Sequence, residues 1–388
     1  MSCRPKVCMD TSCIGQVVQG RRGKIVSDKT EELGLRRENK AYCFAVVLTE
    51  CARAFEKAGY NNREINRISE LEHRRCMMDR TISVIIPVIN EEDKIERCLE
   101  AVFCQTINPL EVIVVDGHST DRTVKVAEKF PVMILYEDYH TRAGACQVGV
   151  ENANGEFISF TDADCIPKTN WLECLLNEFD EGIVGVGGGI VNIGEGIWEN
   201  SVNLISGTFL GSANSVQGRF FMDKRFIKSI SGCNNMYKKI EILKVGGFNL
   251  RLSTAEDTEL NSKMLKLGKL LYTPNAVVLH NHKRGLGKFA KRMYQYGYGR
   301  ATAGLWDLQV VPPIIAFLLL ISFVFTPWVL MVMFALYAIM LEFMGIKFAI
   351  SKMNIIYTIT IPITYIIEHM LYALGFWMGI LKSLGETI

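Results

Sequence analysis

Acidic and amide side chains follow three apolar runs of the sequence, at the point where each run ends. They are Asn90 and Glu91 after Ile82–Pro87, Asp116 after Glu111–Val115, and Asp162 and Asp164 after Phe157–Phe160. If the runs are parallel strands of one sheet, their carboxyl ends share an edge, which is where such sheets bind ligands. We therefore expect these residues to line one site.

The triplet Asp162-Ala-Asp164 has the spacing of a cation site. Residues i and i+2 of an extended chain point the same way, so both carboxylates can face one point. Like charges that close repel each other unless a cation lies between them, and carboxylate oxygens suit Mn²⁺ or Mg²⁺. Such a cation would bind a diphosphate and neutralise the charge of a nucleotide leaving group. A helix-capping turn is the alternative interpretation.

The elements that must position these residues alternate between strand and helix from Thr81 to about 282. Short β-branched runs are separated by helical stretches of 10–15 residues, a pattern typical of βαβ units. The strands are apolar throughout rather than alternating, which indicates a sheet covered on both faces. The sequence predicts an α/β fold with a doubly wound, mostly parallel, Rossmann-like sheet, followed by transmembrane helices.

The composition argues against nucleic-acid binding and against structural zinc sites. The 388 residues carry a net charge of only +2, so no overall field attracts nucleic acid, and none is expected as a partner. The 12 cysteines are scattered without paired CxxC motifs, which argues against structural zinc and favours a reducing environment. Hydrophobic residues make up 49% of the chain and gather after residue 308.

This C-terminal part is expected to be a membrane domain, residues 308–388. No charged residue occurs between Asp307 and Glu342, and Pro327 divides the stretch. We predict two spans near 310–326 and 328–345, with one tilted or kinked helix as the alternative. A third apolar stretch, 355–381, carries Glu368 and His369, so the chain has two or three spans.

The segment 283–307 is expected to lie at the membrane surface. Six cations and no acid fall within 283–300, interleaved with Leu, Phe, Met and Tyr. The positive-inside rule then places this segment and the preceding domain in the cytoplasm, at the cell membrane. An ordinary solvated helix face is the alternative.

The first 76 residues form an extension of unknown role. Val7–Ser12 reads weakly as a strand ending in an acidic turn, as in some nuclease domains. Alternatively, translation starts near Met77 or Met78.

Four motifs in order resemble those of family 2 glycosyltransferases with the GT-A fold, over residues 80–282. They are Pro87-Val-Ile-Asn-Glu91, Val115-Asp-Gly-His-Ser-Thr-Asp-Arg-Thr123, Asp162-Ala-Asp164 and Thr254-Ala-Glu-Asp-Thr258. The tail segment from Glu368 to Gly379 is also similar to tails of membrane-associated members.

The resemblance implies a role for each matching position. Pro87, Asn90 and Glu91 would line the nucleotide pocket, and Asp116 would accept a hydrogen bond from the base. Arg142 would contact the diphosphate, Asp162 the ribose and sugar, and Gly232, with the loop to Asn235, a sugar. Asp164 would hold the metal together with His280, which can equally be structural; His282 is a weaker candidate.

The pair Glu256-Asp257 resembles the family's catalytic base. Inverting transfer is a direct displacement, so the attacking hydroxyl must lose its proton. We assign the base to Asp257 and an orienting role to Glu256. Acids after Ser253 or Thr254 are also an ordinary helix-capping pattern.

The sequence departs from the family's motifs at two positions, and a glycine run has another interpretation than a phosphate-binding loop. Ile89 stands where the family often has an aromatic residue, so base stacking there is in doubt. The Gln-x-x-Arg-Trp motif of processive synthases is missing, which favours transfer of a single sugar. The glycine run Gly185–Gly189 lacks a phosphate-loop lysine and is interpreted as a crowded strand edge.

The sequence thus predicts a membrane-bound, metal-dependent hexosyl- or N-acetylhexosaminyltransferase of cell-envelope glycan synthesis. It would move one sugar from a UDP- or GDP-sugar to a hydroxyl of a lipid-linked acceptor, with inversion. The alternatives are a polyprenyl-phosphate sugar synthase, which needs no base because a phosphate is already anionic, and a scaffold that binds nucleotide sugars without chemistry. Nucleotidyl transfer accounts for neither Glu256-Asp257 nor the tail.

Overall fold

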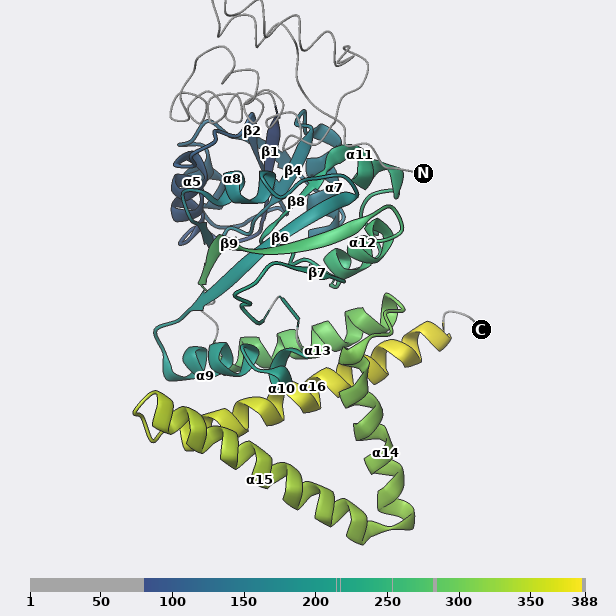
Figure 1. Cartoon of the computed structure of the whole chain (residues 1–388). Coiled ribbons are helices and arrows are strands. Elements are labelled where there is room, and N and C mark those ends of the chain that lie inside the picture. The colour runs from purple at the N-terminus through teal and green to yellow at the C-terminus, as the bar shows by residue number, and fades with distance from the viewer. Residues whose placement is uncertain (1–79, 214, 217, 253, 282–284, 386–388) are drawn as a thin grey trace, which may run out of the picture. The chain divides into compact units, whose positions relative to one another are not determined.

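The computed structural model describes residues 80–385 except 214, 217, 253 and 282–284 (Figure 1). The predictions for the extension 1–76 and a start near Met77 lie outside the described residues, as do His282, Lys283 and Arg284. The chain divides into two units, and the second, Thr81–Ile388, holds the fold described below.

The first half of the sheet is parallel and follows the predicted alternation. The spatial order is β3-β2-β1-β4, and all three pairings between these strands are parallel. Because the order reverses beside β1, the carboxyl ends of β1, β2 and β4 surround a topological switch point. The elements are β1 (Ile82–Val88), α5 (Ile95–Phe103), β2 (Glu111–Asp116), α6 (Thr123–Ala127), β3 (Met133–Tyr136), α7 (Arg142–Asn152) and β4 (Phe157–Phe160).

The second half continues the same sheet with mixed pairing, in the order β8-β6-β9-β5, and β7 pairs with β9. The strands are β5 (Cys165–Pro167), β6 (Ile183–Ile193), β7 (Arg225–Ile227), β8 (Asn235–Lys238) and β9 (Lys269–Asn281). Their helices are α8 (Trp171–Leu176), α11 (Lys239–Lys244) and α12 (Glu256–Met264). The α/β fold predicted from the sequence is confirmed.

The glycine run lies in an interior strand, not at an edge. Strand β6 is hydrogen-bonded to β8 on one side and β9 on the other. The predicted crowding is present: a Cβ on Gly188 would lie 2.0 Å from the carbonyl oxygen of Ala276. Glycine is required because the neighbouring backbone occupies the side-chain position.

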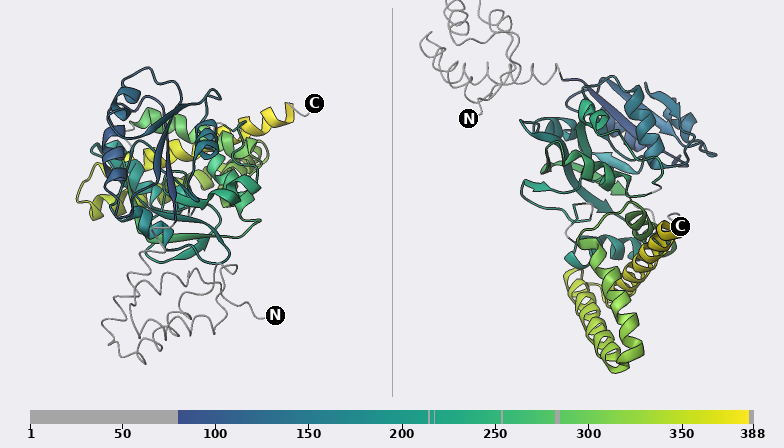
Figure 2. Two further views of the ribbon diagram at one scale, coloured as in Figure 1. Left: turned by 90° about the horizontal axis from the view of Figure 1, so that it is seen from above. Right: turned by 90° about the vertical axis from the view of Figure 1, so that its right-hand side faces the viewer.

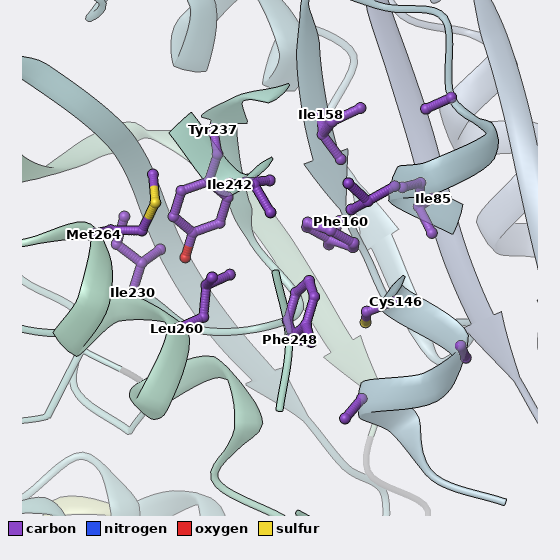
Figure 3. Packing of buried hydrophobic residues seen from close by; sticks show 14 of the residues in the cluster. Ile85, Cys146, Ile158, Phe160, Ile230, Tyr237, Ile242, Phe248, Leu260 and Met264 are labelled. Atoms are coloured by element: carbon purple, nitrogen blue, oxygen red, sulfur yellow. The ribbon is translucent and has the colours of Figure 1, made fainter. Parts of the chain in front are cut away.

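The core of the α/β part is continuous between the sheet and the helices α7, α11 and α12. Ile85 and Phe160 from the parallel half pack with Tyr237, Phe248 and Leu260 from the second half (Figure 3). Phe160 contacts Phe248 edge to face, with ring centroids 5.5 Å apart. Both halves of the sheet therefore share one apolar core, which fixes the strand ends relative to α12.

A layer of helices combines two distant parts of the chain. It contains α9 (Ile197–Ser206) and α10 (Phe209–Ser212), which follow β6, with α13 (Leu286–Thr302), α14 (Val311–Phe325), α15 (Pro327–Ser351) and α16 (Tyr357–Gly385). Helix α16 runs along α13, while α14 and α15 diverge from their shared junction (Figures 1 and 2). The short 3-10 helix Leu308–Val310 precedes α14.

Two helices in the described part of the chain are long and apolar enough to cross a membrane. Helix α15 has a mean hydropathy of 2.2 and is mostly uncovered by protein, whereas α16 has 1.3 and is nearly half covered. Helix α14, with 15 residues, is shorter. The helix break at Pro327 occurs as predicted, but α15 continues to Ser351 rather than ending near 345, because Glu342 and Lys347 end the apolar run without ending the helix.

Candidate active site

The loops after β1 and β2 are tied together by side chains that the sequence places at the strand ends. Asn90 has a left-handed backbone, φ 53°, and its Oδ1 accepts a hydrogen bond from the Thr120 amide at 2.8 Å. Asp116 is buried, and its two oxygens accept from the amide and hydroxyl of Ser119. The Glu91 amide donates to Thr123 Oγ1 at 2.8 Å. The structure thus brings Asn90, Glu91 and Asp116 together beside Pro87, the residue of β1 paired with Val115.

A cluster of Asp162, Asp164 and His280 lies beyond β4. Antiparallel pairing sets Cys165 of β5 opposite His280 of β9, so the imidazole lies beside the neighbouring Asp164. His280 Nε2 is 3.1 Å from Asp164 Oδ1, and one ligand atom from each of the three residues falls within 4.8 Å of the others. Two carboxylates and one imidazole are a donor set that fits Mn²⁺ or Mg²⁺.

The electrostatic field of the cluster also suits a cation. Burial by itself lowers the pKa of His280, but the neighbouring Cys233, Asp164 and Asp162 outweigh this effect and raise the pKa overall. The surrounding negative charge therefore favours the positive form of the imidazole. The same field would attract a divalent ion.

Arg142 bridges the cation cluster and the candidate base. It is the first residue of α7, whose N-terminus is capped by Thr141. Its Nη2 is 2.7 Å from Asp162 Oδ1, and its Nη1 is 2.7 Å from Glu256 Oε1. Nη2 also donates to the carbonyl oxygen of Gly232 at 2.9 Å. The guanidinium binds two carboxylates of the protein here, and the expected diphosphate contact stays a prediction.

The pair Glu256-Asp257 begins α12, after Ala255 in a left-handed conformation with φ 64°. Glu256 is buried, and this burial raises its pKa despite the opposing charge of Arg142. Asp257 is partly exposed; its Oδ2 accepts from the Gly232 amide at 2.9 Å and its Oδ1 from the Thr258 amide at 2.7 Å. Asp257 is therefore held by backbone donors with its carboxylate at the protein surface.

One cavity of about 610 Å³ joins these groups to the helical layer. Arg142, Asp162, Gly232, Glu256, Asp257 and His280 line it, whereas Pro87, Asn90, Glu91, Asp116 and Asp164 are not among its lining residues. Helices α9, α10, α13 and α16 also contribute to the wall, with residues that include Asn203, Gly211, Arg292, Tyr296 and Glu368. The cavity is within the volume range of small-molecule sites.

Comparison with known proteins identifies this arrangement. The family model described as glycosyl transferase family 2 matches residues 83–242, which contain the strand ends, Arg142 and the Asp162-Asp164 cluster. Residues 83–242 form a family 2 glycosyltransferase domain.

Two curated relatives are archaeal. The glycosyltransferase is 28% identical over 326 residues to a dolichyl N-acetyl-α-D-glucosaminyl phosphate 3-β-D-2,3-diacetamido-2,3-dideoxy-β-D-glucuronosyltransferase of Methanococcus voltae, spanning 78% of this chain and 98% of the relative. It is also 28% identical over 236 residues to glycosyltransferase AglE of Haloferax volcanii, spanning 58% of this chain and 75% of that one.

A solved structure confirms the GT-A fold. The mannosyltransferase PcManGT of Pyrobaculum calidifontis, solved in complex with GDP-mannose and Mn²⁺, superposes with a TM-score of 0.52. Sequence identity is 21%, and the match covers 77% of this glycosyltransferase and 87% of the mannosyltransferase.

Two asparagines of the glycosyltransferase hold the loop that follows Gly232 in place. Asn234 donates to the carbonyl oxygens of Gly189 and Ala276 and accepts from Trp171 Nε1. Asn235 is also buried, and its amide donates to the Ser231 carbonyl at 2.7 Å. Both side chains hold the loop against β4, β6 and β9, and the expected sugar contact of the loop from Gly232 to Asn235 stays a prediction.

Two thiols next to the cation cluster were missed by sequence reasoning. Ligand atoms of Cys165, Cys233 and His280 also lie within 4.8 Å of one another, and all three residues are buried. Cys165 follows the Asp162-Ala-Asp164 triplet directly, but nothing local in the sequence signals that Cys233 approaches it across the sheet. His280 thus belongs to two groups of possible ligands, one with hard oxygen donors and one with soft sulfur donors.

Gly232→Ala is expected to lower transfer about tenfold, as a displacement of preorganised groups does. A Cβ at this position would lie 2.7 Å from Arg142 Nη1, so the guanidinium must leave its place between Asp162 and Glu256. Steady-state transfer rates measure the effect. Gly207→Ala is the control, since its nearest neighbour would be a carbonyl oxygen at an ordinary 3.5 Å. Equal rates for both variants would contradict a positioning role for Arg142.

Proposed function

We propose that the glycosyltransferase moves one sugar, with inversion, from a UDP- or GDP-sugar to a hydroxyl of a membrane lipid-linked acceptor. The observation that carries the proposal is the cavity: it connects Asp257 and Asp162 with helices α13 and α16 of an apolar helical layer. An acceptor with a polar head and a lipid tail can enter along these helices and place its head at Asp257.

The relatives support this substrate class. The Methanococcus voltae protein is named for transfer to a dolichyl-phosphate-linked N-acetylglucosamine, and the present chain spans 98% of it. The mannosyltransferase of the same fold holds GDP-mannose and Mn²⁺. We extend a nucleotide-sugar donor and a divalent cation to this chain on those grounds and on the donor set of Asp162, Asp164 and His280.

The membrane arrangement follows from charge and apolarity. We propose a catalytic domain at 80–282, a basic interfacial segment at 283–307 and a membrane domain at 308–388. On α13, Lys288, Lys291, Arg292 and Arg300 precede the apolar helices, and the positive-inside rule places this side in the cytoplasm.

In the proposed reaction, Asp257 takes the proton of the acceptor hydroxyl as its oxygen attacks the anomeric carbon of the donor sugar. The new glycosidic bond forms as the bond to the nucleotide diphosphate breaks, and the leaving oxygen keeps the electron pair. Glu256 holds Arg142, which orients Asp162 toward the donor. A cation held by Asp164 and His280 would neutralise the diphosphate charge.

The test is transfer by the purified full-length protein in detergent, offered UDP- and GDP-sugars, Mn²⁺ and polyprenyl-linked acceptors. Transfer of one sugar, with a product of inverted configuration by NMR, is the expected result. Donor binding without transfer to any acceptor would contradict the proposal and favour a scaffold. Transfer only to bare polyprenyl phosphate would favour the phosphate sugar synthase.

Asp164→Ala is expected to lower this transfer about 100-fold, because a Lewis acid contributes several kcal/mol to stabilising a leaving group. EDTA should have the same effect on the unmodified protein and little further effect on the variant. The control is Asp180→Ala, an exposed aspartate in the turn before β6. Full activity of Asp164→Ala in EDTA would rule out metal dependence.

A further inference from the structure

Glu368 is a buried carboxyl group that the proposed reaction does not use. It lies near the middle of α16, its exposed fraction is 8%, and it lines the cavity that reaches the candidate base. Its Oε2 has no hydrogen-bond partner among the described residues. A buried polar atom without a partner is costly, and such atoms in folded proteins are rare.

Most of the neighbouring polar groups on the same helix have partners, although the buried Tyr372 hydroxyl, like Glu368 Oε2, has none among the described residues. Thr360 receives a hydrogen bond from Ser201 of α9 at 2.8 Å, and the hydroxyl of Tyr365 is 2.7 Å from that of Thr208. His369 Nε2 is 3.1 Å from the Leu210 carbonyl oxygen, and its Nδ1 is 2.8 Å from the Tyr337 hydroxyl. The polar face of α16 therefore docks α9 and α10, and Glu368 takes no part in this docking.

A glycine of α10 lies beside Glu368 in the wall of the cavity. Gly211 of α10 stands opposite, and a Cβ there would lie 3.3 Å from Glu368 Oε2 and 2.4 Å from the Ile205 carbonyl oxygen. Gly211, His369 and Tyr372 also line the cavity. Gly211 thus packs close to the buried Oε2 of Glu368, and both residues belong to the wall of the cavity that reaches the catalytic groups.

The chemistry of a carboxyl group restricts which ligand can satisfy Glu368. In either ionisation state the group has an oxygen that accepts hydrogen bonds, and a ligand with hydroxyl or amide N–H donors satisfies it. A phosphate group does not meet this requirement, and the same cavity offers it Lys288, Lys291 and Arg292 of α13. A ligand with both a phosphate and a sugar matches the two kinds of lining.

We propose that Glu368 is an acceptor-binding residue that accepts hydrogen bonds from hydroxyl or acetamido N–H groups of a sugar already attached to the lipid-linked acceptor. The inference rests on the proposed function, since it assumes a lipid-linked acceptor in this cavity. It goes further by requiring that the acceptor bear a sugar. Glu368 then discriminates glycosylated lipid phosphate from bare lipid phosphate.

The experiment measures binding and transfer separately with the full-length protein in detergent. The probes are polyprenyl phosphate carrying one N-acetylhexosamine and bare polyprenyl phosphate. Glu368→Ala should weaken binding of the glycosylated probe about tenfold or more, and Glu368→Gln less, because its amide keeps one acceptor oxygen. Binding of the bare probe and of the nucleotide sugar should not change. Glu342→Gln, an exposed glutamate on α15, is the matched control.

Each other outcome has a defined meaning. The proposed sugar-binding role of Glu368 is wrong if both Glu368 variants bind the glycosylated probe as well as the unmodified protein does. It is also wrong if the variants lose affinity equally for both probes. If the unmodified protein binds neither probe, the inference is also wrong. If it binds the glycosylated probe through Glu368 but transfers no sugar to it, the proposed function fails while the binding site stands. Should Glu368→Ala not fold, the near-isosteric Glu368→Gln decides the question.

Discussion

Asp257→Asn should lower the rate of sugar transfer about 1,000-fold while nucleotide-sugar binding is retained, since general-base catalysis contributes about 100- to 10,000-fold. The carboxylate is held by the amides of Gly232 and Thr258, at 2.9 and 2.7 Å. Its position in the cavity wall lets a remaining lone pair take the proton of an acceptor hydroxyl. The kcat for transfer and the Kd for the donor, measured on one preparation, separate chemistry from binding.

Glu259→Gln is the matched control for this variant. Glu259 lies in the same first turn of α12 but is paired with Lys263 at 3.0 Å and does not line the cavity. Its replacement should leave kcat within about twofold, because this half-buried ion pair lies outside the cavity wall. If Asp257→Asn retains most of its activity, the nucleophile is already anionic, and a lipid phosphate becomes the acceptor.

Gly297→Ala should lower the melting midpoint of the protein in detergent by about 6–12 °C. The reason is a backbone contact: a Cβ on Gly297 of α13 would lie 2.0 Å from the Tyr372 carbonyl oxygen of α16. The contact is reciprocal, since a Cβ on Gly375 of α16 would lie 2.0 Å from the Tyr294 carbonyl oxygen. Small residues allow this approach, as in membrane helix pairs. Forcing the helices apart lowers the free energy of unfolding by about 3 kcal/mol, near the upper range for overpacking. Each kcal/mol lost lowers the melting midpoint by about 2–4 °C.

Gly287→Ala provides the control on the same helix. A Cβ there would meet nothing within 4 Å, so the change adds only helix propensity, about 0.5–1 kcal/mol. Its melting midpoint should stay equal or rise slightly. Two variants that melt alike would show that the α13–α16 contact does not limit stability.

The Gly297 variant should also lose activity, because α13 contacts the loop before α12. Thr254 Oγ1 donates to the Gln295 carbonyl oxygen at 2.9 Å, and a Cβ on Gly299 would lie 1.8 Å from the same hydroxyl oxygen. A shift of α13 therefore moves the segment that leads to Glu256 and Asp257.

The strand ends could be predicted because their signal is local. The apolar runs of β1, β2 and β4 are short and bounded by polar residues, and the structure has Phe157–Phe160 as predicted. Asn90, Asp116 and the Asp162-Asp164 pair follow these runs directly. Parallel pairing then brings the strand ends together without further information.

The rest of the site depends on long-range contacts that no local pattern contains. Arg142 meets Glu256 across 114 positions, and His280 meets Asp164 across 116. Both contacts are set by strand register and by the packing of α7 against α12. The sequence contains these residues but not their pairing, which is why the bridging place of Arg142 and the approach of Cys233 were missed.

The sequence predicts that the C-terminal tail forms apolar helices, but it does not predict how these helices pack. Hydropathy located the helices and the break at Pro327, whereas the docking of α9 and α10 depends on hydroxyl pairs such as Ser201 with Thr360. Polar residues inside an apolar segment are ambiguous in sequence, since they can face lipid headgroups, a partner helix or a ligand.

The insertion of α9 and α10 between β6 and β7 means that the α/β part and the apolar helices cannot be separated by cutting the chain once. A fragment ending before α13 would keep Thr208 and Leu210 but lose Tyr365 and His369, the groups that hold them. It would also lose the α13 and α16 walls of the cavity. The α/β part and the apolar helices are consecutive in sequence but interlocked by their contacts, so a change in the packing of the apolar helices would alter the shape of the cavity beside Asp257.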